Sequence, residues 1–216
     1  MHYGSEFPEN SLIAFAAALE LGAGIECDLR LTADDQIIVF HDADAMRICG
    51  SPLRIGQNSW GELSRHSVGE HPIPTIEALL TLIEGRVPLL LEVKVEKDIW
   101  RWMAALTTAL ADYEGPFSVM SFDARIPRLL KTNFPEARRG LVIRDSLSPV
   151  RRRLAMWLAD PHFIAVERIC LSKPWVERLR QRMPVYAWTI RTATERAQAE
   201  VQADALIWEG DCRPRN

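Results

Sequence analysis

The stretch GIECDLRLTADDQIIVFHD, residues Gly24–Asp42, decides how this sequence is interpreted. It places Glu26 and Asp28 two residues apart in an apolar run, so on a β-strand their side chains point to the same face. Burying two like charges side by side costs free energy unless a cation or hydrogen bonds offset the repulsion. A second apolar run, IIVF, ends on His41 and Asp42. The stretch therefore predicts part of a metal site with a histidine beside it.

A second strand carries the same spacing of charges. In LLLEVK, Leu89–Lys94, the side chains of Glu92 and Lys94 share one face at the end of an apolar run. Active sites of α/β barrels are built at the carboxyl ends of the strands. Acids alone suit a hard cation such as Mg²⁺ or Ca²⁺, and no histidine or thiolate cluster suggests zinc. Two alternatives stay open: one acid of the first pair could bind Arg30 at the surface, and Glu92 and Lys94 could form a structural ion pair.

Composition narrows the class of protein. The chain has 216 residues, 48% hydrophobic and 25% charged, which is typical of one soluble globular domain. The formal net charge of −3 argues against a nucleic-acid partner. The four cysteines are widely spaced, without a C-x-x-C pair, and we expect reduced thiols in a cytoplasmic protein. No run approaches the roughly 18 apolar residues of a transmembrane segment, and no signal peptide is visible.

Apolar patterning predicts helices and strands that alternate along the chain. Residues 43–72 lack this periodicity and are expected to be a short inserted loop region within a single domain spanning 1–216. With Ile37–His41 counted as an extension of Gly24–Leu31, which would be the second strand of a barrel, seven barrel strands are expected: Gly24–Leu31, Val87–Val95, Phe117–Phe122, Gly140–Ile143, Phe163–Val166, Val185–Ile190 and Ala205–Trp208. A (β/α)₈ barrel needs an eighth strand, and the missing one would be the first. The predicted fold is therefore a TIM barrel that lacks its first strand.

Six motifs in order extend this interpretation over nearly the whole chain. They are PENSLIAF (Pro8–Phe15), the E-x-D and F-H-D pair of Gly24–Asp42, IPTIEALL (Ile73–Leu80), LLLEVK, SFD (Ser121–Asp123) and YAWTI (Tyr186–Ile190). Together they resemble the glycerophosphodiester phosphodiesterase family of TIM barrels. The resemblance implies metal-dependent hydrolysis of glycerophosphodiesters, small-molecule substrates, to glycerol 3-phosphate and an alcohol. It assigns metal binding to Glu26, Asp28 and Glu92, phosphate contact to Lys94, proton transfer to His41 and glycerol contact to Trp188.

One family signature is absent. The family opens with a strand ending in H-R-G, whose histidine shares proton transfer with the later one, whereas this sequence begins MHYGSEFPENS. His2 is the only N-terminal candidate, and Tyr3 stands in place of the arginine. We expect that the sequence starts late and that the codons upstream encode the missing strand. A non-catalytic barrel that binds metal or phosphate stays open as an alternative, as does lysophospholipase D activity. The last strand reads ALIWEGD, where Glu209 is a candidate for the family's aspartate.

A basic stretch follows the middle of the chain. It contains Arg138, Arg139, Arg144 and Arg151–Arg153, with Trp157 close by. We expect a solvated helical face here. A patch that meets a membrane surface is the alternative.

Overall fold

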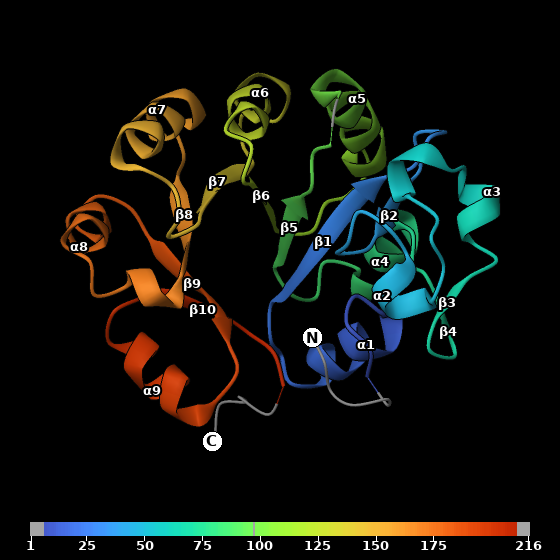
Figure 1. The fold of residues 1–216 in the computed structure, drawn as a ribbon, viewed down its shortest axis with the longest axis horizontal. Coiled ribbons are helices and arrows are strands. Elements are labelled where there is room, and N and C mark those ends of the chain that lie inside the picture. Colours follow the sequence, from blue (N-terminus) through green and yellow to red (C-terminus); the bar gives the residue numbers. More distant parts are fainter. Residues whose placement is uncertain (1–6, 97, 211–216) are drawn as a thin grey trace. The chain divides into compact units, whose positions relative to one another are not determined.

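The computed structural model describes residues 7–96 and 98–210, which fall into two compact units (Figure 1). The N-terminal unit is the described part of residues 4–119, and the C-terminal unit is that of residues 120–216. Every strand predicted from the sequence has a counterpart, and helices alternate with the strands as expected. Within the described residues no strand precedes the first helix, and His2 lies outside them. No helix among these residues is long and apolar enough to cross a membrane.

The N-terminal unit combines strands of a sheet with the helices that pack on them. Its elements are α1 (Leu12–Glu20), β1 (Ile25–Leu31), β2 (Ile37–Val39), α2 (Met46–Cys49), η1 (Ile55–Gln57), α3 (Trp60–Leu63), β3 (Ser67–Val68), β4 (His71–Pro72), α4 (Ile76–Ile83), β5 (Leu89–Val93) and α5 (Ile99–Leu110). The next strand, β6 (Phe117–Ser121), spans the boundary between the two units.

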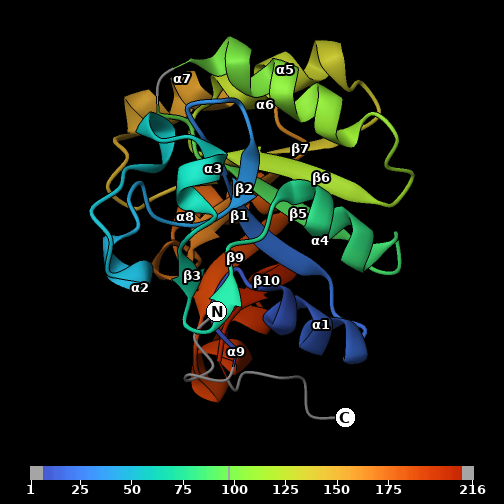
Figure 2. The same cartoon turned by 90° about the vertical axis from the view of Figure 1, so that its right-hand side faces the viewer.

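Side-chain caps fix where the first helices begin. The Ser11 hydroxyl accepts a hydrogen bond from the backbone N–H of Ala14 at the start of α1. Thr75 does the same for Ala78 at the start of α4. Such caps satisfy backbone donors that have no partner inside the helix. Helix α1 then packs against α4 and β1 (Figure 2).

Strand pairing sets the register on which the site depends. β1 pairs in parallel with β5, with Asp28 opposite Glu92, and in antiparallel with β2, with Leu29 opposite Val39. β2 ends at Val39, two residues before the predicted end, so His41 lies just beyond the strand. The strand interiors are buried, as expected for a parallel sheet covered on both faces.

Residues 43–72 are more structured than the expected loop region. They contain α2, η1, α3 and the small antiparallel pair β3–β4. Buried Ile55, Leu63 and Val68 pack with Ile38 and Phe40 in one hydrophobic cluster. The segment therefore has a small core of its own, continuous with β2 and the residue after it.

The C-terminal unit repeats the alternation of strand and helix. Its elements are α6 (Arg125–Asn133), β7 (Arg138–Ile143), α7 (Pro149–Ala159), β8 (Phe163–Glu167), η2 (Arg168–Cys170), α8 (Pro174–Arg180), β9 (Val185–Ile190), α9 (Ala193–Glu200) and β10 (Ala205–Trp208). β8 pairs in parallel with β7 and with β9, and β9 pairs in parallel with β10.

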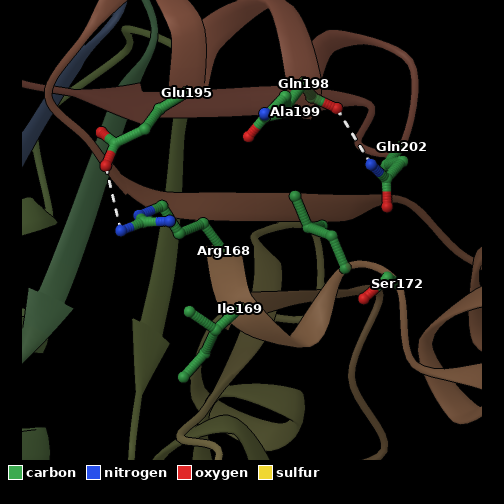
Figure 3. A pocket seen from close by; sticks show the side chains of 8 residues that line it. Arg168, Ile169, Ser172, Glu195, Gln198, Ala199 and Gln202 are labelled. Atoms are coloured by element: carbon green, nitrogen blue, oxygen red, sulfur yellow. Dashed lines mark hydrogen bonds and ion pairs between the residues drawn. The ribbon is translucent and has the colours of Figure 1, made fainter.

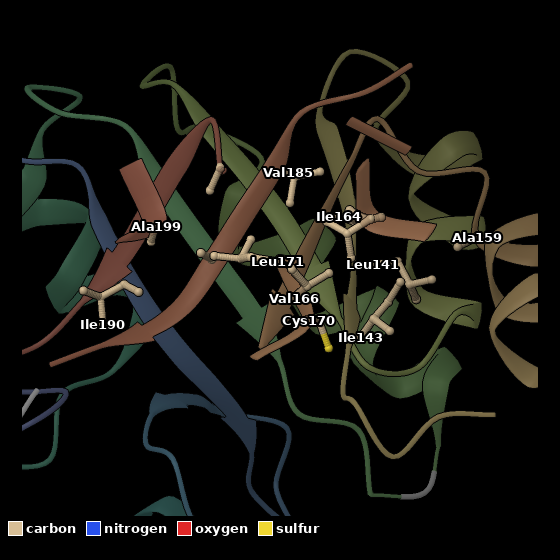
Figure 4. Close-up of a cluster of buried hydrophobic side chains, with 13 residues drawn as sticks. Leu141, Ile143, Ala159, Ile164, Val166, Cys170, Leu171, Val185, Ile190 and Ala199 are labelled. Carbon is tan, nitrogen blue, oxygen red and sulfur yellow. The ribbon is translucent and has the colours of Figure 1, made fainter. Parts of the chain in front are cut away.

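Aliphatic side chains from these strands and helices form one buried cluster (Figure 4). Ile143, Ile164 and Val166 are fully buried in it. At one end of the sheet, the Phe163 ring lies so close to Gly140 that a Cβ there would meet the ring at 2.3 Å. Glycine at position 140 is thus required by this close approach of β7 and β8.

Candidate active site

The three predicted metal ligands lie together in the N-terminal unit. Glu26 and Asp28 point to one face of β1, and the strand register sets Glu92 of β5 opposite Asp28 on that face. One carboxylate oxygen from each residue lies within 4.8 Å of the others. Asp28 and Glu92 are buried and Glu26 is half-buried. Spacing within one strand and register between two strands therefore build a compact set of oxygen donors.

Lys94 lies next to these acids, one residue after β5. Its Nζ is 2.9 Å from Oδ1 of Asp28 and also forms an ion pair with Glu92. Burial by itself would lower the pKa of Lys94, but the two carboxylates raise it above its ordinary value. The lysine is therefore a charged ammonium that neutralises part of the acid cluster.

The pKa values of the three acids are shifted in different directions. Burial raises the pKa of Glu26 well above its ordinary value, and the charges of Asp28 and Glu92 raise it further. Burial also raises the pKa of Glu92. For Asp28 burial acts in the same sense, but Lys94 and the other groups around it hold the pKa below its ordinary value.

Crowding of this kind fits a hard divalent cation. All donors are carboxylate oxygens, which Mg²⁺ and Ca²⁺ prefer. A cation between the acids would relieve the repulsion that Lys94 relieves only in part. The residues present therefore suit such an ion.

Asn10 is a site residue that the sequence patterns do not identify. Its Nδ2 donates to Oδ2 of Asp28 at 2.9 Å, and its Oδ1 accepts from the Asp28 backbone N–H at 3.2 Å. The residue has a φ of 54°, a left-handed conformation that asparagine tolerates better than most residues. The only available signal was its place in P-E-N-S immediately before the helix.

His41 is held by a chain of charged groups. Its Nδ1 lies 2.7 Å from Oδ1 of Asp42. The other oxygen of Asp42 accepts from Arg47, which also pairs with Glu9. The His41 side chain is about half exposed. With Nδ1 bound to Asp42, the ring presents Nε2 to a ligand.

Arg30 supports His41 rather than neutralising the strand acids. Its Nε and Nη2 both donate to the His41 backbone carbonyl, at 2.9 and 2.8 Å, and its Nη1 pairs with Glu96. The alternative in which Arg30 pairs with Glu26 or Asp28 is therefore wrong. The Glu92–Lys94 ion pair does form, within the acid cluster.

Trp188 belongs to the C-terminal unit, near the end of β9. Its ring meets that of Phe122 edge-on, with 5.7 Å between centroids, and the Arg144 guanidinium covers Phe122 at 4.2 Å. Within the described residues the indole Nε1 is buried without a hydrogen-bond partner. Buried tryptophan N–H groups usually have an acceptor. This orphan donor distinguishes Trp188 from an ordinary core aromatic.

Two other features of the C-terminal unit carry charged side chains that are already paired with each other. A cavity of about 220 Å³ lies between η2 and α9, and Arg168 and Glu195 at its edge are already paired (Figure 3). Glu209, the candidate replacement for the family's aspartate, forms an ion pair with Arg191.

Comparison with known proteins decides the family. The model of the glycerophosphoryl diester phosphodiesterase family matches residues 3–209. The chain belongs to this family. It is 22% identical to the Bacillus subtilis protein YhdW over 214 residues, which cover 91% of this chain and 85% of that protein. A glycerophosphodiester phosphodiesterase of Bacillus altitudinis is 32% identical over 109 residues, 46% of this chain and 44% of the relative.

Solved structures confirm the fold class. An Oleispira antarctica phosphodiesterase in complex with its product sn-glycerol-3-phosphate superposes with a TM-score of 0.85 and 23% identity. The match covers 96% of this chain and 90% of the other. The predicted TIM-barrel fold is thus confirmed, and membership of the family makes the protein a phosphoric diester hydrolase.

Proposed function

We propose that this hydrolase splits glycerophosphodiesters into glycerol 3-phosphate and an alcohol, and that it needs a bound divalent cation, Mg²⁺ or Ca²⁺, to do so. The observation that carries the proposal is the cluster of Glu26, Asp28 and Glu92, whose oxygens lie within 4.8 Å of one another. The product held by the Oleispira antarctica phosphodiesterase supports the choice of glycerol 3-phosphate.

Glu26, Asp28 and Glu92 would hold the cation. When bound, it supplies positive charge to the phosphoryl oxygens, which three carboxylates would otherwise repel. Asn10 keeps Asp28 in place through its two hydrogen bonds. Lys94 provides a second positive charge at the same place and contacts the phosphate.

His41 transfers the proton. Asp42 binds Nδ1 and orients the ring, so Nε2 is the atom that gives a proton to, or takes one from, a substrate oxygen. Because Arg30 fixes the His41 carbonyl, both the backbone and the ring of this residue are held. We assign contact with the glycerol group of the substrate to Trp188, whose ring is held edge-on against Phe122.

The first test is the loss of activity in His41→Ala. With glycerophosphocholine as substrate and glycerol 3-phosphate measured, kcat should fall by on the order of 10²–10⁴, the range for a general acid or base. Cation binding should survive, because His41 is not among the three acids. His66→Ala is the matched control, since His66 lies in the same unit and has no proposed role; its kcat should stay at the parent value.

Three outcomes would contradict parts of the proposal. If the parent chain binds Mg²⁺ but releases no glycerol 3-phosphate, the non-catalytic alternative stands. If lysophosphatidylcholine is split much faster than glycerophosphocholine, lysophospholipase D activity is the better description. If the chain stripped with EDTA keeps full activity, the cation has no part in the reaction.

A further inference from the structure

Helix α7 carries an apolar stripe that faces solvent. Val150, Leu154 and Trp157 are spaced by four and three residues, so they share one face of the helix. Their exposed fractions are 78%, 61% and 78%. The opposite face of α7 packs on β7 and α6 within the C-terminal unit (Figure 1). Large apolar side chains gathered in this way on an exposed face mark an interaction surface.

Arginines flank this stripe on both sides. Arg151 and Arg153 are exposed, and at 3.6 residues per turn they fall on either edge of the apolar face. Within the described residues neither guanidinium has an ion-pair partner. Arg152, between them in sequence, points the other way and stacks on Trp175 at 4.0 Å. The first turn of α7 contains no acid.

The basic character extends over the whole C-terminal unit. Residues 120–216 contain 18 Lys and Arg against 11 Asp and Glu, whereas residues 4–119 contain 8 against 18. The net charge of −3 is therefore the sum of +7 in the C-terminal unit and −10 in the N-terminal unit. A partner of the α7 face should carry negative charge together with an apolar layer.

We propose that the outer face of α7 docks on an anionic lipid bilayer. Trp157 lies at the headgroup level, as tryptophan does at membrane interfaces, while Val150 and Leu154 enter the acyl boundary. Arg151 and Arg153 contact the lipid phosphates on either side. The sequence favoured a solvated helical face, but the exposure of three apolar side chains in one row favours its alternative. A bilayer offers both the apolar layer and the negative charge that this face requires.

Vesicle flotation with the full chain tests this docking. The protein should float with vesicles of phosphatidylcholine containing about one third phosphatidylserine, and binding should weaken as salt is added. The double variant Leu154→Ser, Trp157→Ser should lose at least about tenfold in partition coefficient, because it removes the apolar contact. Arg151→Gln with Arg153→Gln should lose about fivefold per arginine.

Matched controls come from the acidic unit. Trp100 on α5 is 67% exposed and Arg65 is an exposed arginine, so Trp100→Ser and Arg65→Gln should bind vesicles as the parent does. All variants should keep the parent's hydrolysis of soluble glycerophosphocholine. Equal binding to pure phosphatidylcholine, or equal losses in the control variants, would overturn the proposal. So would a parent dimer that becomes monomeric in the Trp157 variant, since the face would then meet a second copy.

Discussion

At the scale of single residues, the acid cluster that suits a cation lowers the stability of the folded protein when no cation is bound. Glu26 has its pKa raised by burial and by two neighbouring carboxylates, so its charged form is disfavoured in the folded chain. Lys94 neutralises Asp28 and Glu92 but leaves Glu26 without an ion pair among the described residues. A site prepared for a cation is therefore a source of instability while the cation is absent.

Glu26→Gln should separate the instability of the cation-free protein from the stability gained when a cation binds. In EDTA the amide replaces a carboxyl group whose ionisation is opposed by burial and by two neighbouring carboxylates, so the free energy of unfolding should rise by about 1–3 kcal/mol. With saturating Mg²⁺ the parent should gain stability from binding, and the variant should gain much less because it has lost a ligand. Urea unfolding in the two buffers measures both quantities. Glu20→Gln, at an exposed position on α1, should change neither. A variant that is less stable in EDTA would show that Glu26 stabilises the cation-free protein.

Lys94→Met should move cation affinity and activity in opposite directions. The ammonium lies 2.9 Å from an oxygen of Asp28, so it competes with a cation for the same acid. Its removal should strengthen Mg²⁺ binding by on the order of tenfold, measured by calorimetry. Hydrolysis of glycerophosphocholine should nevertheless fall, because the phosphate loses a positive partner. Weaker Mg²⁺ binding in the variant would mean that Lys94 organises the acids instead of competing for them.

At the scale of elements, the segment before α1 is tied to β1 by one side chain. Asn10 accepts from and donates to Asp28 across 18 positions of sequence while it holds a φ of 54°. The start of a helix and the middle of a strand are thereby fixed to each other at the acid cluster.

Two substitutions of Asn10 distinguish its side chain from its backbone. Asn10→Gly keeps the left-handed conformation and loses both hydrogen bonds, so Mg²⁺ binding should weaken while stability falls by about 1–3 kcal/mol. Asn10→Ala should lose about 1 kcal/mol more, because a Cβ disfavours positive φ. Thermal unfolding and Mg²⁺ titration of the two variants give the comparison. Parent-like affinity in Asn10→Gly would remove Asn10 from the site.

What the sequence could predict also depends on the element. The period of two on β1 and β5 predicts that the acids share a face, and the apolar runs predict every strand outside residues 43–72. Asn10 could not be found in this way, because its role depends on a contact between distant segments. The four-residue helices α2 and α3 are too short to show a helical period. The Glu9–Arg47–Asp42 chain behind His41 likewise joins three segments that no local pattern connects.

At the scale of the whole molecule, the acids, His41 and Lys94 belong to one compact unit and Trp188 to the other. The prediction of a single domain over 1–216 remains untested. Two cysteines can report on it, one from each unit. Cys27 and Cys170 are both fully buried, whereas Cys49 is half-buried, and none of the three forms a disulfide.

We expect Cys27 and Cys170 to become reactive together as the chain unfolds. Burial and the nearby Asp145 raise the pKa of Cys170 to about 11, so at about pH 8 only about one thiol in a thousand is ionised. Of the three cysteines among the described residues, Cys49 should therefore be the first that iodoacetamide modifies in the native protein. Across a urea series, mass spectrometry should give one midpoint for Cys27 and Cys170, and saturating Mg²⁺ should raise both equally, because a single cooperative domain unfolds in one step. If Mg²⁺ shifts only the Cys27 midpoint, the acid cluster stabilises residues 4–119 alone and the chain is two domains.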